Sequence, residues 1–369
     1  MNRRILAAFL ALLLATLACG TELPQTIPTL ASSPYDLDRT LYGFFPSPPE
    51  ISLDSVMETY EALGQHGDVV LLQQNIPWEY FVGGSNGSEA QVIKDIRNQY
   101  ILAHQQGLEV IFIVDPLNGL DRRQFAGLPD GWEASFANPQ VRAAFTNFTL
   151  RVLREFEPRY LGLSSEINTY HDTHPEDFPN YLSLYNEVYA LIKAEAPETQ
   201  VFVTFQWDEL NNLMPSVARG DPYEVNWDQV EQFEPGLDLW VISSYPFFLF
   251  PGGADIPADY YSPLLSRTSK LLAVAEGGYT SQPVGPFRGS EQDQVDYLNA
   301  IHSQIGGDRL AFWIYLLIND INMESYAGFM DDEGQSADFD TLGLFASVGL
   351  TEADRTPKAA LEVWDSFRK

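Results

Sequence analysis

The segment YLGLSSEINTY, residues 160–170, is a short apolar run that ends in a carboxylate, Glu166. A nearly continuous apolar run of this length predicts a strand that is buried on both faces. Seven further runs of the same kind are spread along the chain, with amphipathic stretches between them. The eight expected strands cover residues 41–45, 68–74, 109–115, 160–165, 201–206, 237–245, 271–276 and 310–315. Strands that alternate with helices are typical of β/α units around a parallel sheet.

Helical signals lie between most of the expected strands. Asn138 is placed to cap a helix that begins at Pro139, and Ser290 is placed to cap another that ends at Gly306. Further helices are expected over residues 91–106 and 181–196, and a closing helix is expected from residue 356. The weakest unit lies between the fifth and sixth strands, where residues 227–233 are the helical candidate.

Eight β/α units without a break in composition predict a single (β/α)8 barrel, a TIM barrel of the α/β class, over residues 40–369. Catalytic groups of this fold come from the C-terminal ends of the strands, so the position of a polar residue becomes informative. A doubly wound open sheet is the main alternative. No glycine-rich nucleotide-binding motif follows the first strand, and we expect no cofactor.

The composition is that of a globular protein with a strong negative charge. Hydrophobic residues make up 45% of the chain, which is enough to bury a large core. The net charge of −30 disfavours binding to nucleic acid or to an anionic membrane surface. A neutral or cationic partner fits better, and the acidity also has the simpler explanation that it keeps an exported protein soluble. We expect a monomer.

The N-terminus predicts export and a membrane anchor. Residues 1–19 contain two arginines, an apolar run over 5–17, and the single cysteine of the chain, Cys19. This segment resembles a bacterial lipoprotein signal, whose cleavage would leave Cys19 as a lipid-bearing N-terminus, although Thr16 is a less usual residue at its position. A plain secretory peptide with an incidental cysteine is the alternative. Residues 20–39 have the composition of a flexible tether. We therefore expect an extracytoplasmic protein that is lipid-anchored to a bacterial membrane, at the cell surface or in the periplasm.

Two carboxylates lie at the ends of expected strands. Glu166 follows the fourth strand and Glu276 ends the seventh, so both would face the same mouth of a closed barrel. Two facing carboxylates about 5 to 5.5 Å apart can carry out retaining glycoside hydrolysis, in which one protonates the leaving oxygen and the other attacks the sugar. The alternative for either residue alone is a solvated or salt-bridged glutamate at a strand end.

Three segments strengthen the catalytic interpretation. SSEIN (164–168), LDLWVISSYPFF (237–248) and AEGGY (275–279) resemble sequences of the clan-A (β/α)8 glycoside hydrolases, and within that clan they are most similar to the arabinogalactan endo-β-1,4-galactanase family. The resemblance extends in layout over residues 41–369. It implies that Glu166 is the general acid/base, that Glu276 is the nucleophile, and that Tyr245 lies near the nucleophile. The implied substrate is a β-linked polysaccharide or oligosaccharide, cleaved with retention.

One position departs from the pattern of the clan. Its members usually have an asparagine before the acid/base glutamate, where the amide helps to bind the sugar 2-hydroxyl, and this chain has Ser165. A serine hydroxyl reaches less far and makes fewer hydrogen bonds than an amide. The substitution puts both the identity of the substrate and full activity in doubt. Asn75, after the second strand, and Asn168 are candidates to replace the missing amide.

Other side chains near strand ends are candidates for substrate contact. Flat aromatic rings suit the apolar faces of sugars, although core packing is an equal alternative for the tryptophans and the favoured one for Phe247 and Phe248. The aromatic candidates are Tyr245, Trp78, Trp207 and Trp313, and the acidic candidates are Asp115 and Asp208.

Two polar segments invite a metal-binding interpretation that the residues do not support. Residues 171–174, HDTH, lack a further ligand set, and the acidic residues 330–340 lack the spacing of an EF-hand loop. We expect no metal.

Two other classes of protein fit parts of the sequence. A non-catalytic carbohydrate-binding lipoprotein could have kept the barrel and lost turnover, and Ser165 is its best support. A transport solute-binding lipoprotein would share the signal and the tether, but it requires two lobes around a hinge rather than a ring of eight strands.

Overall fold

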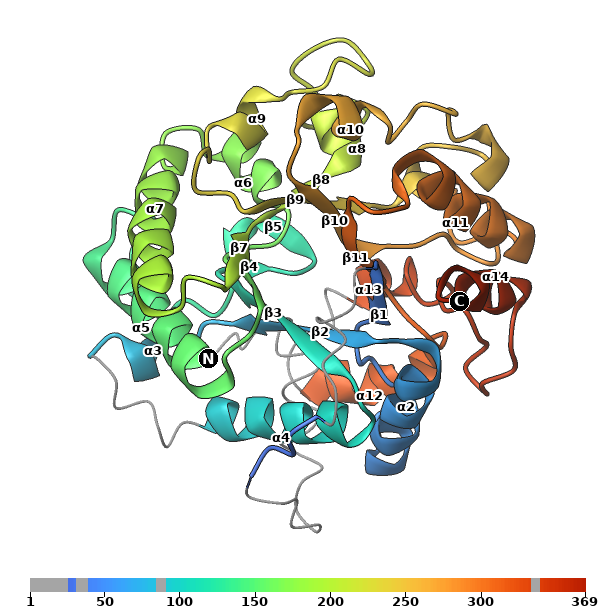
Figure 1. The fold of residues 1–369 in the computed structure, drawn as a ribbon, viewed down its shortest axis with the longest axis horizontal. Coiled ribbons are helices and arrows are strands. Elements are labelled where there is room, and N and C mark those ends of the chain that lie inside the picture. The colour runs from blue at the N-terminus through green and yellow to red at the C-terminus, as the bar shows by residue number, and fades with distance from the viewer. Residues whose placement is uncertain (1–25, 31–38, 84–90, 333–338) are drawn as a thin grey trace. The chain divides into compact units, whose positions relative to one another are not determined.

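Figure 1 shows the computed structural model of the chain, which describes residues 26–30, 39–83, 91–332 and 339–369. The predicted signal peptide with Cys19, most of the predicted tether and most of the acidic stretch 330–340 lie outside the described residues. Within the described ranges, no helix is both long and apolar enough to cross a membrane.

All eight predicted strands are present in one sheet. They are β1 (Leu41–Phe44), β2 (Val69–Asn75), β3 (Glu109–Asp115), β6 (Tyr160–Gly162), the pair β7 (Gln200–Phe202) and β8 (Thr204–Gln206), β9 (Leu239–Ser244), β10 (Leu271–Gly277) and β11 (Leu310–Tyr315). Their order in the sheet is β7-β6-β3-β2-β1-β11-β10-β9-β8. The pairing is parallel, with Leu41 opposite Phe312 and Phe112 opposite Leu161.

The fifth predicted strand closes the sheet. β7 and β8 are halves of this strand, separated by Val203 alone, and they are the two ends of the strand order. Because one continuous strand forms both ends, the sheet joins itself and the fold is the predicted single (β/α)8 barrel. The open doubly wound alternative is therefore wrong, and the ring of strands argues against a two-lobed solute-binding protein.

The chain divides into two compact units, and the division passes within α4 and within the strands β2, β3 and β9. The first unit contains residues 72–101 and 110–240. Its helices are α3 (Trp78–Phe81), α4 (Gln91–Gln105, which continues past the boundary), α5 (Pro139–Phe156), α6 (Ile167–Thr173), α7 (Phe178–Glu195), α8 (Trp207–Leu210) and α9 (Asp228–Glu231). A hairpin of β4 (Leu117–Asn118) and β5 (Asp121–Phe125) follows β3 and was not predicted.

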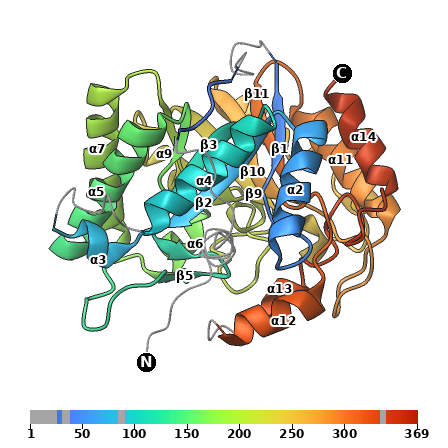
Figure 2. The same cartoon turned by 90° about the horizontal axis from the view of Figure 1, so that it is seen from below.

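Local signals explain where the helices of the first unit begin and how its strands pack. Asn138 caps α5 as predicted, because its side chain accepts a hydrogen bond from the Gln140 N–H at 2.9 Å. Helices α5 and α7 run side by side (Figure 2), and Arg142 of α5 donates to the Asn180 carbonyl of α7. Gly162 of β6 allows close packing, since a Cβ there would lie 2.7 Å from the Ile113 side chain.

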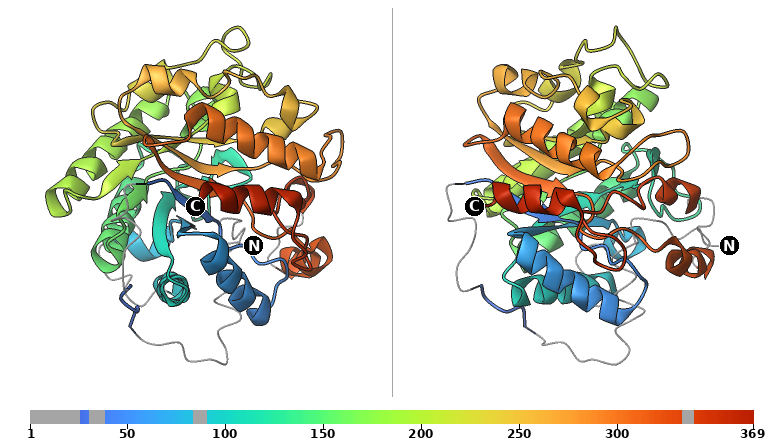
Figure 3. Two further views of the ribbon diagram at one scale, coloured as in Figure 1. Left: turned by 45° about the vertical axis from the view of Figure 1, so that its right-hand side comes forward. Right: turned by 90° about the vertical axis from the view of Figure 1, so that its right-hand side faces the viewer.

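The second unit contains residues 28–71, 102–109 and 241–369. Its helices are α2 (Leu53–His66), the short 3-10 turns η4 (Pro246–Phe248) and η5 (Gly253–Asp255), α10 (Pro263–Arg267), α11 (Glu291–Ile305), α12 (Met323–Asp332), α13 (Phe339–Gly343) and α14 (Ala359–Phe367). Ser290 caps α11 as predicted, and α11 lies beside α14 in both views of Figure 3. The fully buried Trp364 of α14 packs against Tyr42 and Phe44 of β1.

An ion cluster joins the two sequence ends of the second unit. Asp68, which precedes β2, accepts hydrogen bonds from Arg39 at 2.8 and 2.9 Å and from Arg368 at 3.3 Å. Arg39 lies two residues before β1, and Arg368 follows α14 directly. These contacts lower the pKa of the Asp68 carboxyl against the opposing effect of its burial, which would raise it.

Candidate active site

Glu166 has an unusual backbone conformation. It follows β6 and caps the N-terminus of α6 with φ 49° and ψ 45°, in the left-handed region. This conformation costs a non-glycine residue about 1 to 2 kcal/mol, and such strain clusters at functional sites. The Glu166 N–H donates to the Thr204 hydroxyl of β8 at 2.7 Å, and the side chain is 12% exposed. The surrounding structure therefore fixes the backbone of this carboxylate residue.

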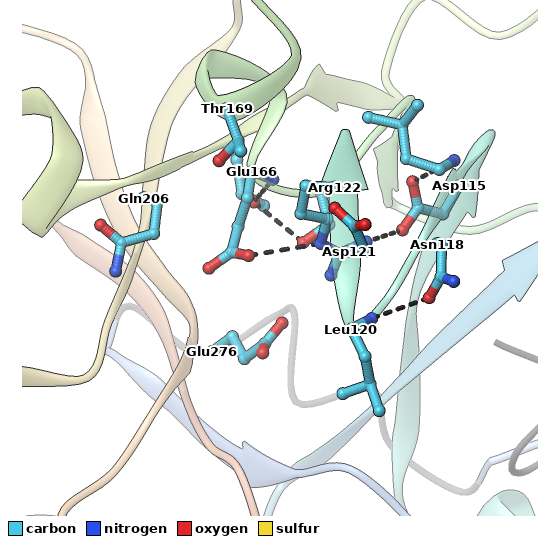
Figure 4. Close-up of polar contacts among 12 residues, drawn as sticks. Asp115, Asn118, Leu120, Asp121, Arg122, Glu166, Thr169, Gln206 and Glu276 are labelled. Atoms are coloured by element: carbon cyan, nitrogen blue, oxygen red, sulfur yellow. Dashed lines mark hydrogen bonds and ion pairs between the residues drawn. The ribbon is translucent and has the colours of Figure 1, made fainter. Parts of the chain in front are cut away.

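Arg122 of the hairpin binds the Glu166 side chain. Its Nε donates to Glu166 Oε2 at 3.3 Å, while Nη1 contacts Asp115 Oδ2 at the end of β3. Figure 4 shows Arg122 lying between these two carboxylates. Arg122 was not predicted from the sequence. The Asn118–Gly119 pair is a hairpin signal that could have indicated the turn, but not the partner of Arg122, which is 44 residues away.

Asp115 is fully buried and accepts several hydrogen bonds. Besides Arg122, its donors include Gln73 Nε2 at 2.8 Å, the Leu117 N–H at 3.1 Å and the Ser164 hydroxyl at 3.4 Å. Burial raises the pKa of Asp115, and Arg122 and the Leu117 N–H partly offset this effect. The structure therefore places Asp115 as an internal anchor of the hairpin rather than as an exposed substrate contact.

In the second unit, Glu276 lies in β10 with Tyr245 as its partner. Tyr245 directly follows β9, and its hydroxyl donates to Glu276 Oε1 at 2.6 Å. The predicted neighbourhood of Tyr245 and Glu276 is thus confirmed. The Tyr245 ring is buried and packs against the Phe345 ring at 5.0 Å. Phe247 is buried in the same aromatic cluster, as the core-packing alternative expected, whereas Phe248 is partly exposed.

The candidate replacements for the missing amide are bound to the protein itself. Asn168 uses both groups of its amide on the backbone of Gln206, accepting at 2.8 Å and donating at 3.1 Å. Asn75 donates to the carbonyls of Asp115 and Leu117 at 2.9 and 3.0 Å. Both side chains are buried, and these hydrogen bonds hold the ends of β8 and β3.

Ser165 and Asp208 are also buried. The Ser165 hydroxyl lies 3.1 Å from the Thr204 hydroxyl, and Asp208 accepts from Gln206 Nε2 at 2.8 Å. Thr204 therefore bonds to both Ser165 and the backbone of Glu166, which links β8 to the segment that carries the candidate acid/base.

The three predicted tryptophan platforms lie in the core. Trp78 donates to the Ala126 carbonyl at 2.6 Å, Trp207 packs against Trp227 at 5.9 Å, and Trp313 packs against Trp364 at 5.3 Å. All three rings are buried, and a buried ring offers no open face to a sugar. This placement matches the packing alternative, and the proposed substrate site does not include these three residues.

The two histidines of the HDTH segment, residues 171–174, contact neighbouring side chains of the first unit. His171 Nδ1 lies 2.9 Å from Asp172 Oδ1, and His174 stacks on the Tyr170 ring at 4.4 Å. Among the residues that the structure describes, no group of three or more histidine, cysteine, aspartate or glutamate side chains is arranged to hold a metal ion.

Glu209 is a second titratable group near Glu166 that the sequence analysis missed. It lies in α8, where Thr169 of α6 donates to its Oε2 at 2.6 Å. Burial raises the pKa of Glu209 to about 8; the Thr169 hydroxyl opposes this shift, and the charge of Glu166 adds to it. Glu209 therefore holds a proton at neutral pH.

Comparisons with known proteins establish the class of fold. No family model and no curated protein matches the chain. The chain is similar in structure to an exo-β-1,4-mannosidase from Opitutaceae bacterium strain TAV5, with a TM-score of 0.62 and 15% identity over 92% of this chain and 62% of that one. The chain thus spans less than two thirds of the mannosidase.

Two further solved structures match this chain over most of their own length. GH5_18 from Bifidobacterium longum gives a TM-score of 0.61 with 14% identity, over 89% of this chain and 78% of that one. A structure of fungal β-1,4-galactanases gives a TM-score of 0.53 with 15% identity, over 89% of this chain and 94% of that one. At these identities the likeness establishes the shared (β/α)8 fold.

Proposed function

We propose that the protein is a retaining glycoside hydrolase that cleaves a β-linked polysaccharide. The observation that carries the proposal is that one carboxylate follows β6 and another lies near the end of β10, and that each has a dedicated side-chain partner. The C-terminal ends of barrel strands form the face where such enzymes place their catalytic groups. The strained backbone of Glu166 is a second, independent sign of function.

In the proposed mechanism, Glu166 is the acid/base and Glu276 is the nucleophile. Glu166 donates its proton to the glycosidic oxygen while a carboxylate oxygen of Glu276 forms a bond to the anomeric carbon and the bond to the leaving sugar breaks. Glu166 then takes a proton from a water molecule, whose oxygen replaces Glu276 at the anomeric carbon. Two displacements give net retention. The Tyr245 hydroxyl, bonded to Oε1, orients Glu276 for the first attack.

The proposed substrate is a neutral β-linked glycan, with β-1,4-galactan first. The motifs of the chain are most similar to endo-β-1,4-galactanases, and galactanases are among the proteins that share its fold. The similar exo-β-1,4-mannosidase makes a β-mannan the second choice. A net charge of −30 disfavours anionic glycans. We further propose that the protein acts as an extracytoplasmic monomer, held to the membrane through a lipid on Cys19.

A non-catalytic carbohydrate-binding lipoprotein is the second candidate. The observation that favours it is Ser165, because its hydroxyl is engaged with Thr204 at the position where the clan carries an amide. Such a protein would bind the glycan without turnover.

A substrate panel tests the proposal. Full-length protein, purified in mild detergent, is incubated with β-galactan, β-mannan and mixed-linkage β-glucan, and released oligosaccharides are measured. We expect products from at least one glycan, with the β-anomer formed first in NMR spectra. Glu276→Gln and Glu166→Gln should each lower kcat on that glycan by about a thousandfold. The exposed Glu198→Gln serves as the matched control and should behave as the wild type.

Three results would change the conclusion. Folded wild-type protein that releases nothing from any glycan would refute the hydrolase proposal. Binding of a glycan without product would favour the non-catalytic candidate. An α-anomer as the first product would exclude the retaining mechanism.

A further inference from the structure

Arg122 connects the candidate acid/base to a buried anchor. We infer, on the basis of the proposed function, that Arg122 is a positioning residue that fixes the Glu166 carboxylate for proton transfer, and that Asp115 holds Arg122 in place for this role. No sequence motif of the chain points to Arg122. The inference comes from its contacts in the first unit.

The anchor is rigid because Asp115 has several donors from different elements. Gln73 of β2 donates to Oδ2 at 2.8 Å, and the Leu117 N–H of β4 donates to Oδ1 at 3.1 Å. Arg122 of β5 reaches the same carboxylate, which is 0% exposed. The two strands of the hairpin pair with each other, and contacts to the Asp115 side chain attach the hairpin to the end of β3.

The guanidinium contacts the two carboxylates through different nitrogens. Nη1 bonds to Asp115 and Nε bonds to Glu166, so one planar group holds both at once. The Arg122 side chain is 6% exposed, so solvent screens these contacts only weakly. Lysine has a single flexible ammonium group and cannot reproduce two separated donors in one plane.

This arrangement acts on a particular chemical step. Arg122 contacts Oε2 of the residue proposed to give and take the proton, whereas the proposed nucleophile Glu276 has Tyr245 as its partner. A displaced Glu166 carboxylate would slow protonation of a poor leaving group. In the first displacement it would matter little for a leaving group that departs as a stable anion, because that departure needs no acid.

The test compares two variants with a neighbouring control. Arg122→Lys keeps the charge and removes the two-donor fork, while Arg122→Gln removes the charge. Arg123→Lys is the matched control, since Arg123 lies in the same strand, is 62% exposed and pairs with Asp121. kcat and KM are measured on the glycan identified by the panel and on two aryl glycosides of its sugar, a dinitrophenyl and a methoxyphenyl glycoside.

For the poor leaving groups, the glycan and the methoxyphenyl glycoside, we expect Arg122→Lys to lower kcat about tenfold and Arg122→Gln to lower it further, with KM within about twofold of the wild type. For the dinitrophenyl glycoside we expect the kcat/KM of both variants, which reports the first displacement, to lie within about threefold of the wild type. Arg123→Lys should match the wild type on every substrate.

A double variant separates positioning from folding. Arg122→Gln alone leaves Asp115 buried without its paired cation, which can lower the melting temperature or prevent folding. Asp115→Asn combined with Arg122→Gln removes both charges, so its melting temperature should return toward that of the wild type. Its kcat on the poor leaving groups should stay low.

The inference would be overturned if the two Arg122 variants kept wild-type kcat on all substrates. It would also fall if their loss of kcat/KM were equal for all leaving groups, because an effect on structure alone does not discriminate between them. Recovery of kcat together with stability in the double variant would likewise contradict it. An inactive wild type on the whole panel would instead mark the failure of the proposed function, which is a separate result.

Discussion

At the scale of single residues, Glu166 combines a strained backbone with a side chain bound in an ion pair. Its φ of 49° favours glycine, yet the position carries a carboxylate held by Arg122. A chain selected for stability alone would place glycine there. Glutamate at this position lowers the stability of the fold and supplies a carboxylate, as expected where the side chain has a chemical role.

The strain gives a stability prediction. Both Glu166→Gly and Glu166→Ala lose the ion pair. The difference between their free energies of unfolding therefore reports mainly on the strain of the backbone. We expect Glu166→Gly to be more stable than Glu166→Ala by about 0.5 to 1 kcal/mol, because relief of left-handed strain exceeds the entropy that glycine adds to the unfolded chain. Urea unfolding measures the difference. If Glu166→Ala proved the more stable variant, Glu166 would carry no appreciable strain.

Tyr245 gives a second prediction at this scale. Tyr245→Phe removes the hydroxyl that donates to Glu276 Oε1 at 2.6 Å and keeps the ring. A hydrogen bond to a charged group is worth about 1.5 to 3 kcal/mol, so we expect kcat to fall by about ten- to a hundredfold. Tyr189→Phe is the control, since it also removes a hydroxyl that donates to a carboxylate, that of Asp238, at 3.0 Å. Neither Tyr189 nor Asp238 is close to Glu276 in the sequence. Equal kcat values for the two variants would contradict an orienting role.

At the scale of elements, the contact between α6 and α8 involves a buried glutamate whose pKa is raised, Glu209. Glu209 of α8 accepts from Thr169 of α6, and its pKa is raised to about 8. The unfolded chain releases this proton near 4.5, the ordinary value, and the folded protein keeps it to about pH 8. The unfolded state therefore binds fewer protons between these values, and the contribution of Glu209 to stability falls as pH rises through that window.

Glu209→Gln should remove this pH dependence. We expect the unfolding free energy of the wild type to decline relative to the variant from about pH 4.5 to about pH 8, and to run parallel to it below that range. Urea unfolding at half-unit pH intervals measures the difference, with the exposed Glu198→Gln as the control. A constant difference across the window would show that Glu209 is ionised in the folded protein at neutral pH.

The sequence predicted the regular elements well and the contacts between them poorly. Apolar runs located all eight strands, and the caps Asn138 and Ser290 located two helix starts, because these signals are local. The hairpin β4–β5 escaped because it is short and largely polar. The sequence left sugar contact and core packing as equal alternatives for Trp313, because the direction of its ring, which packs against Trp364 of α14, depends on the register of the strand.

The candidate site was predictable only in part, for the same reason. The strand-end rule located Glu166 and Glu276, and a short motif located Tyr245. Arg122 bonds to Glu166, 44 residues away, and Glu209 bonds to Thr169, 40 residues away. No local sequence pattern marks such pairs. The left-handed backbone of Glu166 is likewise a product of the tertiary structure.

At the scale of the whole molecule, the proposed lipid anchor is open to direct test. Cys19→Ser removes the thiol that a lipid would modify, and the chain has no other cysteine. We expect the wild type to sediment with membranes and to partition into detergent, and the variant to lose lipid labelling and partition into the aqueous phase. Labelling of the variant equal to that of the wild type would refute the anchor.

The ion cluster around Asp68 has a consequence for the connectivity of the barrel. Arg39 and Arg368 bind one carboxylate, so the chain segments that precede β1 and follow α14 meet at a single point. A short linker between them would span little distance, and new termini could then be opened at an exposed loop, such as residues 221–224. A circularly permuted protein of this design should fold to the same ring of strands, because the order of strands around a closed barrel has no fixed beginning.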